Sequence, residues 1–242
     1  MDIPQKFGTE FLAWFRAHTE AAWARYQTTD FTTPPSAGVD WMNGTHWLPG
    51  LSTEAIDAIE QKWSVRFPPD YRLFLQLLHA VDRPMIAASF REQGIILGES
   101  PAFYNWLTDT AEIERRFTEP VEGLLFDVRY NDLWLPQWGN MPHALTVREP
   151  RVRELAKSAP KLIPVFGHRF LVSEPYQAGN PVISVSQADI VVYGSDLRAY
   201  LLRELADVLN LRTLDWLGNV TPSTSIVNIP FWGDFIQKRQ SK

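Results

Sequence analysis

The five histidines of this 242-residue chain are its residues best suited to catalysis or metal binding near neutral pH. They are scattered, and no His-x-x-x-His or paired-carboxylate spacing places several ligands on one helix face. The chain has no cysteine, which removes disulfides, thiolate nucleophiles and cysteine-ligated metals, and it has no Gly-x-Gly-x-x-Gly or phosphate-binding loop. We therefore expect neither a metal nor a cofactor.

A serine nucleophile is the next chemistry to consider, because Gly194-Ser195-Asp196-Leu197 superficially resembles a serine-hydrolase motif. A nucleophile elbow requires Gly-x-Ser-x-Gly at a strand-to-helix turn, and here the second glycine is absent. Capping of a helix explains both polar residues, with Ser195 as the cap and Asp196 at the positive helix end. We expect no enzyme, and a small hydrolase using Ser195 or a histidine–carboxylate pair is the least favoured alternative.

Two adjacent polar residues, His168 and Arg169, have side chains suited to binding a partner's carboxylates. Arginine offers two donors to one carboxylate, and histidine can become charged near neutral pH. The alternative role is structural, since polar residues beside strands usually satisfy hydrogen bonds of the fold. The pair is therefore a candidate for partner binding, with stabilisation of a strand edge as the competing interpretation.

Aromatic residues provide the other candidates for partner binding, because the chain has ten tryptophans. Trp134 and Trp138 bracket a Leu-Pro-Gln turn, where at least one ring could remain exposed and act as a binding hot spot. The competing interpretation is that both rings fill the core. Tyr176 completes the set of candidate partner-binding residues.

The spacing of apolar residues predicts the elements that position these side chains. Helices are expected at 7–26, after a cap at Ser52, from Pro69 onward, at 109–117, at 149–156 and after Ser195. Short β-branched and aromatic runs predict strands at 94–97, 123–126, 162–166, 168–172, 181–185 and 189–193.

Helices that flank hairpin-like strands predict an α+β fold, with a central, mainly antiparallel sheet flanked by helices and an additional N-terminal helix. We divide the chain into an N-terminal helix and linker at 1–47, a main domain at 48–209 and a C-terminal extension, packed on that domain, at 210–242.

The composition, 45% hydrophobic and 21% charged, is that of a globular protein. The net charge of −5 disfavours nucleic acid and anionic membranes as partners and mildly favours a basic protein. The sequence shows neither a secretory signal nor an apolar run of the roughly 18 residues that a membrane span requires. These features, with the absence of cysteine, predict a cytoplasmic protein.

Three motifs together resemble the SUKH superfamily of Smi/Knr-like proteins. They are Phe-Pro-Pro-Asp-Tyr-Arg-x-Phe-Leu at 67–75, Leu-Trp-Leu-Pro-x-Trp-Gly at 133–139 and Asp-Ile-Val-Val-Tyr-Gly-x-Asp-Leu-x-x-Tyr-Leu at 189–201. The resemblance spans about 48–209, so the main domain is SUKH-like. Two features depart from the family: Asn140-Met141-Pro142 stands where relatives often have Arg-Pro, and 84–132 has no clear match.

The resemblance implies an α+β fold with a central sheet, a binding role and no catalytic chemistry. Many bacterial members look like immunity proteins, which sequester a toxin, whereas fungal relatives regulate cell-wall synthesis by contacting signalling proteins. We therefore expect a bacterial immunity protein that neutralises, by direct binding, a toxin encoded by a neighbouring gene. The alternative is a regulatory or scaffold protein without a toxin partner.

Overall fold

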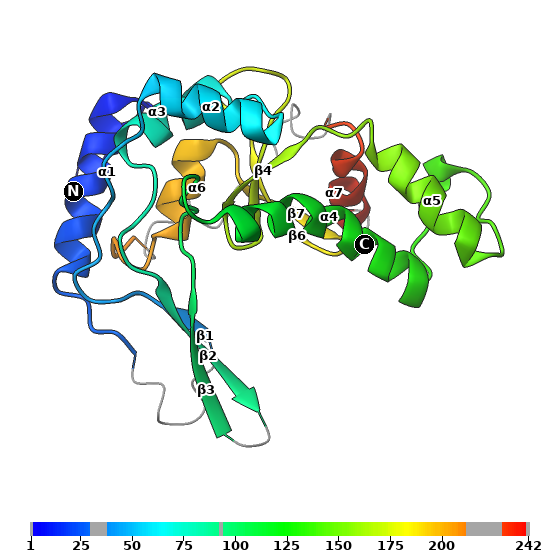
Figure 1. The fold of residues 1–242 in the computed structure, drawn as a ribbon, viewed down its shortest axis with the longest axis horizontal. Coiled ribbons are helices and arrows are strands. Elements are labelled where there is room, and N and C mark those ends of the chain that lie inside the picture. Colours follow the sequence, from blue (N-terminus) through cyan, green and yellow to red (C-terminus); the bar gives the residue numbers. More distant parts are fainter. Residues whose placement is uncertain (1, 30–37, 92–93, 212–228, 241–242) are drawn as a thin grey trace.

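The computed structural model describes residues 2–29, 38–91, 94–211 and 229–240 (Figure 1). Their helices are α1 Thr9–Trp23, α2 Thr53–Trp63, α3 Pro69–Leu77, α4 Thr110–Tyr130, α5 Leu145–Ala156, α6 Leu197–Glu204 and α7 Trp232–Gln240. Their strands are β1 Gly38–Asp40, β2 Met85–Arg91, β3 Gly94–Ser100, β4 Leu162–Phe166, β5 Arg169–Val172, β6 Val182–Ser186 and β7 Asp189–Gly194. None of these helices is long and apolar enough to cross a bilayer.

The strands form two antiparallel sheets, which confirms the α+β class. Strands β4, β5, β6 and β7 pair in chain order and make the central four-stranded sheet. Strands β1, β2 and β3 make a second sheet, which projects from the body of the molecule as an arm (Figure 1). Of this arm, the sequence predicted only the strand at 94–97.

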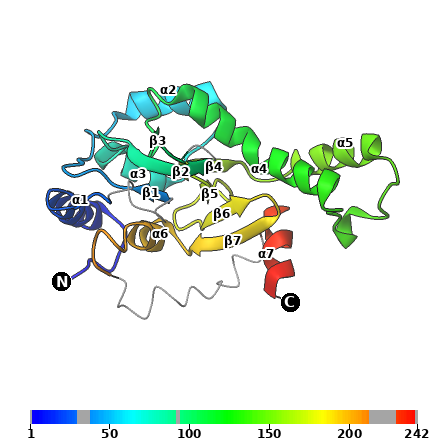
Figure 2. The same cartoon turned by 90° about the horizontal axis from the view of Figure 1, so that it is seen from below.

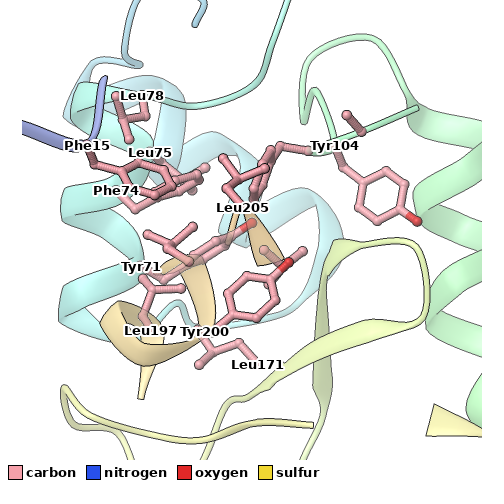
Figure 3. Packing of buried hydrophobic residues seen from close by; sticks show 14 of the residues in the cluster. Phe15, Tyr71, Phe74, Leu75, Leu78, Tyr104, Leu171, Leu197, Tyr200 and Leu205 are labelled. Atoms are coloured by element: carbon pink, nitrogen blue, oxygen red, sulfur yellow. The ribbon is translucent and has the colours of Figure 1, made fainter. Parts of the chain in front are cut away.

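Helices α1, α2, α3 and α6 surround the larger of two apolar cores. Trp47 joins the N-terminal helix to α3, because its ring centroid lies 5.9 Å from those of both Phe15 and Phe74. Figure 3 shows Tyr71 and Phe74 of α3 packed close to residues of α6, among them Tyr200. The N-terminal helix therefore shares this core.

Local signals explain why the first helices begin where they do. The Ser52 side chain accepts a hydrogen bond of 3.2 Å from the Ala55 backbone N–H, as an N-cap does. Pro69 occupies the first turn of α3, where its missing N–H costs nothing. At the start of α6, by contrast, the cap is Asp196, whose side chain accepts from the Ala199 N–H at 2.7 Å. The prediction of Ser195 as the cap is wrong.

The strand predicted at 123–126 is also wrong, because these residues lie inside α4. The helix expected at 109–117 continues through Pro120 to Tyr130. Proline removes one backbone hydrogen bond from the helix. The helix nevertheless persists, since Ile113, Leu124 and Val128 bury one continuous face on both sides of the proline.

A smaller core lies between α4, the central sheet and α7. Trp232 in α7 closes it, donating through its indole Nε1 to the Pro160 carbonyl at 2.9 Å. Figure 2 shows α7 beside the start of β7. Within the predicted C-terminal extension, 229–240 thus packs on the sheet, whereas 212–228 lies outside the described residues.

Candidate partner-binding surface

The α4–α5 pair forms a projection that is anchored to the β6–β7 turn of the central sheet near the C-terminal end of α4. The buried Asp127 carboxylate accepts from the Ala188 backbone N–H at 2.8 Å and from the Asn131 side chain at 2.6 Å. Gly123 allows the close approach, because a Cβ there would lie 3.1 Å from the Gln187 Cα. Helix α4 runs away from α1, with α5 beside its C-terminal part (Figures 1 and 2).

Three ion pairs hold the two helices antiparallel. Arg153 bonds to Glu122 at 2.7 Å, Arg129 to Glu149 at 2.8 Å and Arg148 to Asp132 at 3.3 Å. Each pair includes an exposed group, so each contributes little stability alone. Together they set the register of the helices, because a shift along the axis would break all three.

Exposed apolar side chains are frequent in the far part of this projection. Half of the ten large apolar side chains exposed in the described residues lie between 126 and 147. We call this group the α4–α5 tip: Phe126, Tyr130, Met141, Leu145 and Val147. Phe126 and Tyr130 are one helical turn apart, and their ring centroids are separated by 4.8 Å. Adjacent exposed apolar side chains, as Phe126 and Tyr130 are, are typical of a surface that binds another protein.

Trp134 and Trp138 lie in the connection between the same two helices. Their rings meet edge to face with centroids 5.4 Å apart. Trp138 is buried and packs 6.0 Å from the Phe235 ring of α7, so it anchors the connection to the smaller core. Trp134 is half-buried and donates through Nε1 to the Gly139 carbonyl at 2.8 Å. Of the two, Trp134 is the ring that a partner at the tip could contact.

His168 and Arg169 lie at the β4–β5 turn, where Arg169 is already engaged by its own chain. Its guanidinium makes an ion pair of 3.3 Å with Glu204, a hydrogen bond of 2.9 Å with Ser184 and a stacking contact 3.7 Å from the Tyr193 ring centre. The pKa of Glu204 is raised by its burial, against the opposing attraction of Arg169. These contacts favour the structural interpretation of Arg169.

His168 is exposed and touches the Arg169 side chain. Its pKa is lowered, first by desolvation and then by the positive charge of Arg169. A lowered pKa keeps the ring neutral near pH 7, so at that pH His168 would offer a partner hydrogen bonds and no charge.

Tyr176 lies beyond the opposite end of β5 from His168. Tyr176 is 43% exposed, and the Arg66 guanidinium carbon lies 3.3 Å from the centre of its ring. Asp70 fixes the loop by accepting from the Gly179 N–H at 2.8 Å, and burial raises the pKa of Asp70. The five predicted residues therefore occupy three places: the α4–α5 connection, the β4–β5 turn and this loop.

In the described part of the chain, His46, His79 and Ser195 lie in separate places. His79 is buried, and its Nε2 accepts from the Trp106 N–H at 3.2 Å. His46 lies 3.7 Å from Asp82 at the surface. Ser195 is half-buried beside the α6 cap, and the described residues contain no cluster of three or more potential metal ligands.

Sequence reasoning missed the α4–α5 tip because it placed a strand at 123–126. Phe126 and Tyr130 are spaced i, i+4, so a prediction of a continuous helix would have placed both rings on one helix face. No family model, curated protein or solved structure matches this chain.

Proposed function

We propose that this chain is a non-enzymatic SUKH-type binding protein of the cytoplasm, which neutralises a toxin encoded by a neighbouring gene by covering its active surface. The α4–α5 tip carries the proposal, since it presents apolar and aromatic side chains on two helices and their connection, and ion pairs join the two helices. Aromatic anchors on a rigid support lose little conformational entropy when they bind.

The motifs that resemble those of SUKH proteins are the reason for choosing a toxin as the partner. The net charge of −5 adds electrostatic attraction to a toxin that carries basic residues for nucleic acid. Charge of this kind mainly accelerates association, so we expect the association rate to fall as salt is raised while dissociation changes little.

Co-expression with the product of the neighbouring gene tests the function. We expect the two proteins to co-purify and this chain to restore growth to cells that express the toxin. Failure of both would refute toxin neutralisation. A regulatory or scaffold protein would instead leave growth unrescued, while binding a partner that is not toxic.

The surface is tested separately in the purified complex with Phe126→Ala and Tyr130→Ala. Because exposed aromatic side chains often dominate the binding energy, each change should weaken binding and raise the dissociation constant about tenfold or more. Leu107→Ala is the matched control, since Leu107 is 57% exposed and lies outside the tip. If both tip variants bind like the control, the partner uses another surface. That result would leave toxin neutralisation standing wherever growth is rescued.

A further inference from the structure

Strand β3 forms an open edge of the arm. The strand order β1-β2-β3 leaves its outer side unpaired among the described residues. Its register with β2 runs without interruption from Met85 opposite Ser100 to Arg91 opposite Gly94, so no bulge bends the edge away. The outer backbone N–H and C=O groups are therefore arranged to pair with another strand.

The sequence of β3 lacks the usual protection of an edge. Gly94–Ser100 contains no proline and no lysine, and Glu99 is its one charged residue. Ile96 is 50% exposed and Leu97 is 56% exposed, on opposite faces of the strand. A long apolar edge of this kind favours pairing with a further strand.

The pattern of β3 is complementary to itself in an antiparallel pairing centred on Ile96. A two-fold axis perpendicular to the sheet does not exchange the two faces of the sheet. Each residue of β3 must therefore pair with a residue of the second copy whose side chain points to the same face. With the axis at Ile96, this residue meets Ile96 of the second copy, Ile95 meets Leu97, and Gly94 meets Gly98. An axis at Leu97 would place Ile95 opposite the charged Glu99.

We propose that β3 pairs antiparallel with β3 of a second copy of this chain, with Ile96 at the two-fold axis. The two arms then form one six-stranded sheet. Val39 is 56% exposed and lies on the same face as Ile96, because it pairs with Ala87, which pairs with Gly98. The combined sheet thus continues an apolar face across the axis.

The dimer should be weak and dependent on concentration. Two strand edges of this length cover less than the interface of about 1,600 Å² that is typical of stable complexes. Sedimentation of the full-length protein should therefore show monomer at low micromolar and dimer at several hundred micromolar concentration. A monomer across this whole range would overturn the proposal.

Charge exchange at Ile96 tests the register and the identity of the partner. Ile96→Lys and Ile96→Glu each place like charges opposite each other across the axis, so each variant alone should dimerise at least about tenfold more weakly. A mixture of the two variants should regain dimerisation, because opposite charges then meet. Leu107→Lys, at a site of similar exposure, should behave like the wild type.

Cross-linking gives an independent measure, because the chain has no native cysteine. Paired residues of antiparallel strands have Cα atoms about 4.5–5.5 Å apart, within the range of a disulfide. Mild oxidation of Ile96→Cys should therefore give a covalent dimer much faster than oxidation of Leu107→Cys. Equal rates, or no recovery in the mixture of charged variants, would show that β3 does not pair with itself.

Discussion

Acidification from about pH 7 to about pH 5 should destabilise the fold through His79. This residue follows α3 with a positive φ of 59°, and its side chain is buried among the residues of the larger core. Its Nε2 accepts from the Trp106 N–H, which requires an unprotonated Nε2. Burial lowers the pKa of His79 to about 4, although the negative charge of Asp109 opposes the shift.

The direction of the pH effect on stability follows from the pKa of His79 in the unfolded and in the folded chain. The unfolded chain takes up a proton on this histidine near its ordinary pKa of about 6.5, while the folded chain does not until about pH 4. Between these values the unfolded state binds more protons, so stability falls as pH falls, and above pH 6.5 the contribution vanishes. The loss in free energy of unfolding at pH 5, relative to pH 7, is about 2 kcal/mol.

Urea unfolding of the wild type and His79→Asn at both pH values measures this loss. Asparagine tolerates the left-handed backbone at this position and does not titrate. Loss of the hydrogen bond to Trp106 lowers the stability of the variant at both pH values. The carboxylates titrate in both proteins, so their contribution to the pH dependence cancels in the comparison. The wild type should lose about 2 kcal/mol more than the variant. An equal loss in both proteins would refute a buried, neutral His79.

Asp196→Ala should cost about 1 kcal/mol of unfolding free energy, whereas Ser195→Ala should cost little, because only the Asp196 side chain caps α6. Trp138→Ala should cost about 3–5 kcal/mol and Trp134→Ala distinctly less, because only the first ring is fully packed. Gly194→Ala should cost about 1–3 kcal/mol or more, since the new Cβ would lie 2.6 Å from backbone atoms of α6. Urea denaturation measures the free energy of unfolding of all these variants. Equal losses for Asp196→Ala and Ser195→Ala, or for Trp138→Ala and Trp134→Ala, would contradict the assigned contacts.

The predictable parts of the fold are those with a local signal. Ser52, Pro69 and the turn at Gly167, whose φ is +51°, mark boundaries through backbone requirements that do not depend on tertiary contacts. The second half of α4 lacked such a signal, because the short apolar run Leu124-Leu125-Phe126 after Gly123 fits a strand as well as a buried helix, and Pro120 suggests that the preceding helix ends. Only burial of the face on both sides of Pro120 decides between them.

The candidate surface was harder to predict, because exposure is a tertiary property. Trp134 and Trp138 have the same type and similar neighbours in the sequence, yet α7 covers one ring and leaves the other half-buried. Nothing within 133–139 indicates that a helix about a hundred residues later packs there. The engagement of Arg169 with Glu204 is likewise a contact between distant segments.

The arm and the α4–α5 tip extend from different parts of the body, so the two proposed contacts do not compete for the same residues (Figure 1). A dimer joined through β3 would therefore carry two free tips. Two linked tips would hold a dimeric or surface-bound target more tightly than either tip alone, because the second contact becomes intramolecular. A monomeric toxin gains nothing from this linkage. Its affinity should therefore be unchanged by Ile96→Lys, whereas that of a dimeric toxin should fall.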